Sequence, residues 1–173
     1  VVTNDPALAE RCRSLRNLCF QVKQRFVHEE LGWNYRMTNL QAALGLAQLE
    51  QLDDFIQKKR WIGKKYTQLL TACRGIQLPL SHTSYADSIY WVFGFVLDKS
   101  VNYDAAEMIS QLASLGVGCR PFFYPMHLQP ALKEMGLFVD QSFPISECLY
   151  SRGLYIPSGL ALREIQIERI SKL

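Results

Sequence analysis

The sequence predicts an α/β chain, in which segments with helical periodicity alternate with short apolar strands. Two kinds of signal favour this class. Thr38 with Gln41, and Asp104 with Glu107, have the spacing of helix capping boxes. Aromatic and β-branched residues are concentrated in residues 89–97, as is typical of a strand. The C-terminal part is therefore expected to be a small α/β or α+β domain, with a sheet that helices cover on one face.

The N-terminal residues predict a strand end followed by a helix. Val1–Thr3 reads as the end of a buried strand. Asn4 or Asp5 then caps a helix that has Pro6 in its first turn, where proline is favoured, and that ends near Asn17.

A long loop and a long helix follow. Residues 18–37 show no sustained period, and an ordered loop of this length is unusual unless it has a function. From Thr38 to about Leu70 the apolar residues recur at three- and four-residue steps, which predicts one long helix, straight or bent. Gly75 and Pro79 interrupt the next segment, which we expect to be a linker and a short strand.

The remaining elements are expected in alternation. In chain order they are a strand at 89–97, a helix from Asp104 to Gly116, a strand at 117–123, helices at 130–135 and 144–151, a short strand at 154–156 and a terminal helix from about Leu162.

Composition excludes several classes of protein. The chain has 173 residues, of which 49% are hydrophobic, and a net charge of +3, which is too small to indicate a nucleic-acid partner. Its five cysteines have no metal-like spacing and predict reduced thiols in the cytoplasm. His28 and Glu29 lack further ligands nearby, so no metal site is expected. No signal peptide or membrane span is recognisable.

Residues 32–44 carry the strongest functional signal. The Thr38–Gln41 capping box fixes a helix start, so Asn34 and Arg36 lie just outside a positive helix terminus. Such a place suits an anion, phosphate above all. The alternative is an ordinary capped helix that binds nothing.

Four ordered motifs give these residues a family context. They are Val1–Asp5, Asn34–Gly45, Arg120–His127 and Arg152–Gly159. With these motifs the chain resembles the DegT/StrS-type sugar aminotransferases over essentially all of its length, and within that family it is most similar to perosamine-synthase-like enzymes. The family consists of pyridoxal-phosphate enzymes of the fold-type-I aspartate aminotransferase class.

The resemblance implies a domain organisation. Residues 1–70 would be the end of the large pyridoxal-phosphate-binding domain plus the long connecting helix, and residues 71–173 the small C-terminal domain. The Schiff-base lysine of the family lies upstream of the position matched by residue 1. We therefore expect no catalytic residue in this chain and no activity of this chain alone.

The resemblance also implies roles for five residues. Asn34 would contact the cofactor phosphate of the other subunit; alternatively, it only turns the loop. Arg36 would bind a donor carboxylate or a substrate phosphate, or else tie the loop to the protein. Arg120, Tyr124 and His127 would line the mouth that binds the sugar nucleotide, although His127 could equally be structural.

The expected parent enzyme is a cytoplasmic homodimer with active sites shared across the interface. It would move an amino group from an amino acid, commonly glutamate, to a nucleotide-linked 4-keto-6-deoxy sugar, with pyridoxal 5'-phosphate as cofactor. Two alternatives stay open: a sugar dehydratase of the same family, with histidine in place of the lysine, and a truncated, non-catalytic fragment or dimerisation remnant. Because the first strand and helices would leave apolar faces uncovered, we also expect the chain alone to associate.

Overall fold

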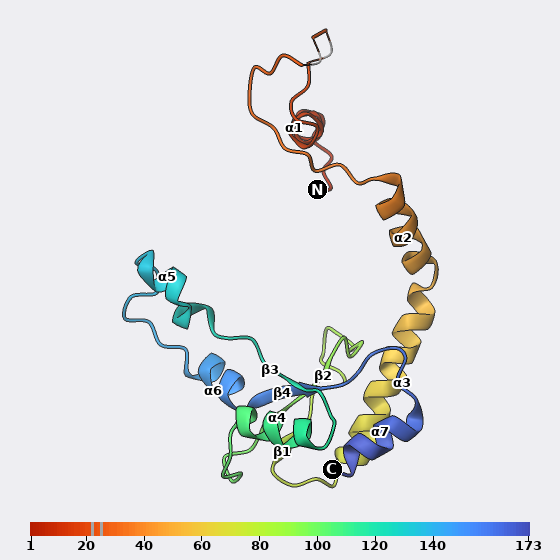
Figure 1. Ribbon diagram of the computed structural model, residues 1–173, viewed down its shortest axis with the longest axis vertical. Helices are drawn as coiled ribbons and strands as arrows, with labels where there is room; N and C mark the ends of the chain where they lie inside the picture. The colour runs from red at the N-terminus through yellow and green to blue at the C-terminus, as the bar shows by residue number, and fades with distance from the viewer. Residues whose placement is uncertain (22, 25) are drawn as a thin grey trace. The chain divides into compact units, whose positions relative to one another are not determined.

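The computed structural model describes residues 1–21, 23–24 and 26–173 (Figure 1). The chain forms two compact units, Val1–Gln51 and Leu52–Leu173. The domain division expected at residue 70 concerns a longer enzyme and stays a prediction.

The first unit begins with α1, Pro6–Arg16. The side chain of Asp5 caps this helix, because its Oδ1 accepts from the amides of Ala7 and Leu8 at 2.8 and 3.1 Å. The helix start is thus as expected. Val1–Thr3 forms no strand, since no segment in the described part of the chain pairs with it.

The expected long helix is two helices, α2 (Asn39–Glu50) and α3 (Leu52–Leu70). Gln51 separates them, with φ −105° and ψ 7°. The capping box at Thr38 is present in full, as the sequence predicted. α2 has apolar residues on all sides and buries none of them in this chain; its exposed leucines are Leu40, Leu44, Leu46 and Leu49.

The second unit contains a four-stranded antiparallel sheet of order β1-β2-β4-β3. The strands are β1 (Ile76–Gln77), β2 (Phe93–Leu97), β3 (Arg120–Pro121) and β4 (Gly153–Ile156). β4 lies in the centre and pairs with both β2 and β3. It brings Arg120, opposite Tyr155, next to residues that follow it by more than thirty positions.

The helices of this unit precede and follow the strands (Figure 1). They are α3, α4 (Ala105–Ser114), the 3-10 turn η1 (Met126–Leu128), α5 (Pro130–Glu134), α6 (Pro144–Arg152) and α7 (Glu164–Ser171). The Asp104 capping box is formed, as expected.

The core lies between one face of the sheet and three helices. Phe93, Phe95 and Leu97 alternate inward along β2, and Leu154 and Ile156 do so along β4. The helices α3, α4 and α7 supply the opposing residues Ile62, Tyr66, Leu70, Ala105, Leu112 and Ile167. The expected α/β class with helices over one sheet face is confirmed.

Two strands are shorter than the sequence predicted. The segment 89–97 enters the sheet only at Phe93, because Tyr90 takes φ +52° and turns the chain. The segment 117–123 contributes only Arg120 and Pro121, the two residues that pair with β4. Among the described residues, no helix is both long and apolar enough to cross a membrane.

Candidate functional site

Backbone hydrogen bonds hold the Trp33–Tyr35 segment against the end of α1. The amide of Trp33 donates to the carbonyl of Leu15 at 2.7 Å, and that of Tyr35 to the carbonyl of Arg16 at 2.9 Å. In return, the amide of Leu18 donates to the carbonyl of Trp33 at 3.1 Å. Asn34 therefore lies on an antiparallel bridge with Asn17. The loop that carries it is fixed by main-chain bonds.

Gly32 makes this close approach feasible. A Cβ atom at Gly32 would lie 2.6 Å from the amide nitrogen of Cys19 and 2.9 Å from its sulfur. Cys19 is fully buried and has φ +51°, so neither its backbone nor its side chain can yield easily. A side chain at position 32 would push the 33–36 segment off α1.

Asn34 offers an uncommitted amide. Its side chain is exposed and makes no hydrogen bond with the described residues. At the adjacent start of α2, Thr38 Oγ1 accepts from the amide of Gln41 at 3.3 Å, and Gln41 Oε1 accepts from the amide of Thr38 at 2.9 Å. The amides of Asn39 and Leu40 in the first helical turn have no side-chain acceptor there. The Asn34 amide and the helix-start amides are each neutral donors of the kind that bind phosphate.

Arg36 is partly engaged. Its Nη1 donates to Oδ1 of Asn17 at 3.1 Å, which ties the loop to the end of α1. The side chain nevertheless stays exposed, and a guanidinium has five N–H donors. The predicted tethering role is therefore present, and the predicted substrate role stays a prediction.

Polar contacts hold the preceding loop. Arg11 and Glu30 form an ion pair, which raises the pKa of Arg11 and lowers the pKa of Glu30, in both cases chiefly through their mutual hydrogen bond. His28 Nδ1 lies 2.7 Å from the carbonyl oxygen of Leu18. His28 and Glu30 thus each tie the loop to α1 or to the residue that follows its C-cap.

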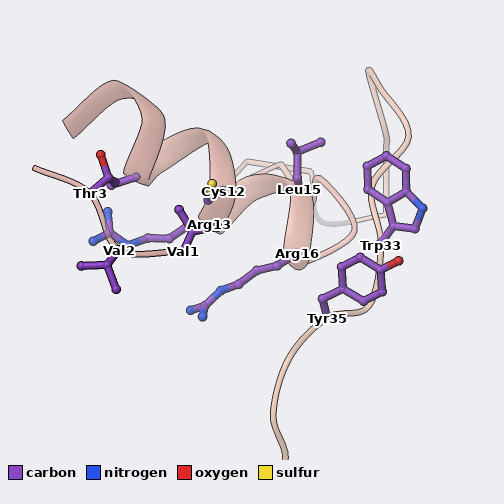
Figure 2. Close-up of a pocket in the computed structure, with 10 residues that line it drawn as sticks. Val1, Val2, Thr3, Cys12, Arg13, Leu15, Arg16, Trp33 and Tyr35 are labelled. Atoms are coloured by element: carbon purple, nitrogen blue, oxygen red, sulfur yellow. The ribbon is translucent and has the colours of Figure 1, made fainter. Parts of the chain in front are cut away.

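A hollow of about 770 Å³ adjoins this segment (Figure 2). The N-terminal residues, α1 and the rings of Trp33 and Tyr35 line it. The two rings lie nearly parallel, with their centroids 6.3 Å apart. Asn34 does not line this hollow, so the hollow and the phosphate-type donors are different features of the unit.

In the second unit, Arg120, Tyr124 and His127 lie on one segment. This segment pairs with β4 at Arg120 and then contacts α6 through Tyr124 and His127. The amide of Phe122 donates to the carbonyl of Gly153 at 3.0 Å, which continues the strand pairing. Tyr124 packs edge-to-face on Tyr150 of α6, with the ring centroids 4.9 Å apart. Arg120 is exposed and has no polar side-chain partner in the described chain.

His127 is committed to the interior of this unit. Its side chain is only 5% exposed. Its Nε2 lies 2.8 Å from Oε1 of Glu147, and its ring packs on Phe143. The His127 hydrogen bond, followed by one from the amide of Phe143, lowers the pKa of Glu147. The geometry is that of a structural histidine that joins η1 to α6, and the predicted substrate contact of His127 stays untested.

The segment after β4 is anchored to α3. Lys59 Nζ donates to the carbonyl of Ser158 at 2.6 Å, and the hydroxyl of Tyr66 donates to the carbonyl of Pro157 at 2.8 Å. Burial lowers the pKa of Lys59 and raises the pKa of Tyr66. Ser158 Oγ accepts from the amide of Phe93 at 3.3 Å, which joins this segment to the start of β2.

The structure thus divides the five predicted site residues between the units. Asn34 and Arg36 lie in the first, and Arg120, Tyr124 and His127 in the second. Sequence reasoning missed the partners Glu147 and Asn17; the only sequence signal for Glu147 is its place in the first turn after Pro144. Within the described residues, no three His, Cys, Asp or Glu side chains gather as metal ligands would.

Comparisons with known proteins agree on one family. The model of the DegT/DnrJ/EryC1/StrS aminotransferase family matches residues 1–173. The chain is 35% identical to the GDP-perosamine synthase of Escherichia coli O157:H7 over 96% of its own length and 43% of that protein. It is 32% identical to the GDP-perosamine synthase of Vibrio cholerae over 98% of its length and 45% of that protein.

A solved structure gives the same result for the fold. The aminotransferase TlmJ of Streptoalloteichus hindustanus superposes with a TM-score of 0.83 at 27% identity, covering 98% of this chain and 44% of that one. The chain spans less than half the length of these relatives. Members of the family depend on pyridoxal phosphate, and the uncommitted side-chain amide of Asn34 is of the type that donates to a phosphate. The chain belongs to the DegT/DnrJ/EryC1/StrS aminotransferase family.

Proposed function

We propose that this chain is part of an enzyme that transfers an amino group from an amino acid, glutamate, to a nucleotide-linked 4-keto-6-deoxy sugar. The observation that carries the proposal is the similarity to two GDP-perosamine synthases over 96–98% of the chain. Pyridoxal phosphate supplies the electron sink for such a transfer. The residues of this chain supply binding and orientation, and the lysine that holds the cofactor lies in a preceding segment.

In this proposal Asn34 donates hydrogen bonds to the cofactor phosphate. Its amide adds no charge, and the three main-chain bonds around it hold it in place before any ligand arrives. The first-turn amides of α2 add to the same positive region. Arg36, while bonded to Asn17, keeps further donors for a carboxylate or phosphate of the substrate.

In the second unit, Arg120 and Tyr124 contact the substrate. Both side chains are exposed: Arg120 directly precedes Pro121, and Tyr124 lies between Pro121 and Pro125 with Tyr150 behind its ring. His127 contributes by keeping that segment on α6 through Glu147. In the proposal, the sugar nucleotide occupies the surface that Arg120 and Tyr124 present.

The proposed enzyme is a homodimer in the cytoplasm, with active sites shared across the interface. The exposed leucines of α2 support association, because a helix that is apolar on all sides is normally covered. Asn34 would then serve the cofactor of the other subunit.

The test uses the full-length protein. It is incubated with a GDP-linked 4-keto-6-deoxyhexose, glutamate and pyridoxal phosphate, and the sugar product is analysed by mass spectrometry. Replacement of the ketone oxygen by an amino group, with release of 2-oxoglutarate, supports the proposal. Loss of a sugar hydroxyl without gain of nitrogen would instead establish the dehydratase alternative, and a cofactor-free protein with no product the non-catalytic one.

Asn34 is tested by cofactor affinity. Loss of a hydrogen bond to a charged group costs about 1.5–3 kcal/mol, so Asn34→Ala is expected to raise the dissociation constant of pyridoxal phosphate roughly 10- to 100-fold. Asn34→Asp should weaken binding further, because it places a carboxylate beside the phosphate. Asn102→Ala, an exposed asparagine of the other unit, is the matched control. Equal affinities for all three variants would show that Asn34 only turns the loop.

A further inference from the structure

Two glycines open a recess in the sheet of the second unit. Gly94 of β2 and Gly153 of β4 lie next to residues that point into the core, so side chains at these two positions would stand on the other face of the sheet. The ring of Phe122 occupies that place. A Cβ atom at Gly94 would lie 2.7 Å from Cε1 of the ring, and one at Gly153 would lie 2.3 Å from Cδ2, on the opposite edge. One edge of the ring thus covers each glycine.

Phe122 and Arg120 stand on the same face of the sheet. Arg120 pairs with Tyr155 of β4, and the amide of Phe122 donates to the carbonyl of Gly153 at 3.0 Å, so the chain is extended through both residues. Side chains two positions apart in an extended chain point to the same side. The depth at which the Phe122 ring sits in the glycine recess therefore determines where the adjoining Arg120 side chain stands.

The ring anchors a segment that has few main-chain bonds. β3 lies at the edge of the sheet and is two residues long. Phe122 is half-buried, whereas its neighbour Phe123 is 78% exposed. Beyond them, Tyr124 rests edge-to-face on Tyr150 of α6. The side chains of Phe122 and Tyr150 thus fix the segment on either side of the exposed Phe123.

We propose that Phe122 is a positioning residue for the substrate surface, and that its ring in the glycine recess sets the placement of Arg120 and Tyr124. The inference rests on the proposed function, in which these two residues contact the nucleotide sugar. Both recess positions must then be glycine, because an added methyl group would push the ring off the sheet. A displacement of about 1 Å in such a surface can cost about 100-fold in activity.

The first test is calorimetric titration of the full-length protein with a GDP-linked 4-keto-6-deoxyhexose, without an amino donor. Phe122→Ala is expected to raise the dissociation constant of the sugar about tenfold, and Phe122→Leu, which fills part of the recess, less. The dissociation constant of pyridoxal phosphate should stay unchanged in both variants, because Asn34 lies in the other unit. A general loss of structure would weaken cofactor binding as well.

The second test couples Phe122 to the recess. Gly94→Ala should raise the dissociation constant of the sugar about threefold, because its methyl group meets the ring. In a Phe122→Ala background the same change should have no further effect, since its nearest remaining neighbour is the carbonyl oxygen of Leu154 at 3.4 Å. Gly159→Ala is the matched control, because nothing lies within 4 Å of its added Cβ, and it should leave the affinity unchanged.

The outcomes separate this inference from the proposed function. Unchanged sugar affinity in a folded Phe122→Ala protein that aminates the sugar would overturn the inference alone, as would an equal effect of Gly94→Ala in both backgrounds. Coupled losses of affinity in a protein that binds the sugar without aminating it would refute the proposed function and support the inference. Circular dichroism of each variant establishes folding.

Discussion

Replacement of Gly63 by alanine is a sharp test of the core of the second unit. Gly63 lies on the buried side of α3, against the ring of Tyr90. A Cβ atom at this position would lie 2.2, 2.4 and 2.6 Å from three ring carbons. The ring cannot withdraw easily, because Tyr90 is 6% exposed and stacks on the fully buried Phe93.

Two effects of opposite sign determine how far Gly63→Ala changes the free energy of unfolding. Overpacking of a tight core costs about 1–3 kcal/mol, and the rigid surroundings of Tyr90 favour the upper end. Alanine in a helix interior is about 1 kcal/mol better than glycine. We therefore expect Gly63→Ala to lower the free energy of unfolding by about 2 kcal/mol.

The assay is urea denaturation followed by circular dichroism, in two backgrounds. Tyr90→Gly removes the ring and also relieves the left-handed backbone at φ +52°. In that background Gly63→Ala should stabilise the protein by up to about 1 kcal/mol, since only the helix propensity remains. Gly45→Ala in α2 is the control, because nothing lies within 4 Å of its added Cβ and it should not destabilise. An effect of the same sign in both backgrounds would refute the reasoning.

Two further predictions concern the anchored segments. Tyr66→Phe leaves the carbonyl of Pro157 without its donor and should lower the free energy of unfolding by about 1–2 kcal/mol, whereas Tyr85→Phe, at an exposed tyrosine, should change nothing measurable. For Glu147, the folded-state pKa is lowered by His127, so its stabilising contribution is present above its unfolded pKa and is lost as the pH falls through the folded pKa. The difference in melting temperature between wild type and Glu147→Gln should accordingly shrink on acidification below pH about 4.5. A difference that stays constant with pH would contradict the proposed pairing with His127.

Local chemistry was readable from the sequence. The capping boxes at Thr38 and Asp104 and the N-terminal Asp5–Pro6 cap form as predicted, since each signal acts within four residues. The predicted bounds of the strands were less accurate. The Tyr90 turn depends on the packing of its ring against Gly63, and no pattern near Tyr90 reveals a partner twenty-seven residues away.

For the candidate site too, the sequence predicted some features and not others. The motifs around Asn34 and Arg120 pointed to the family, and the family match over the whole chain confirms it. They did not distinguish free side chains from engaged ones. Arg36 is bonded to Asn17 and His127 to Glu147, whereas Asn34 and Arg120 have no side-chain partner in the described chain.

The amino-acid sequence was sufficient to predict the starts of α1, α2 and α4, the α/β class and the family, because caps, periodicity and motifs can be read along the chain. Tertiary structure decided the break at Gln51, the short strands and the anchoring of Ser158 by Lys59, ninety-nine residues away. It also brought Arg120 and the buried Ser158 to the lining of one small cleft. Sheet register and helix packing bring such distant residues together, and the energy of those contacts is not encoded in any local pattern.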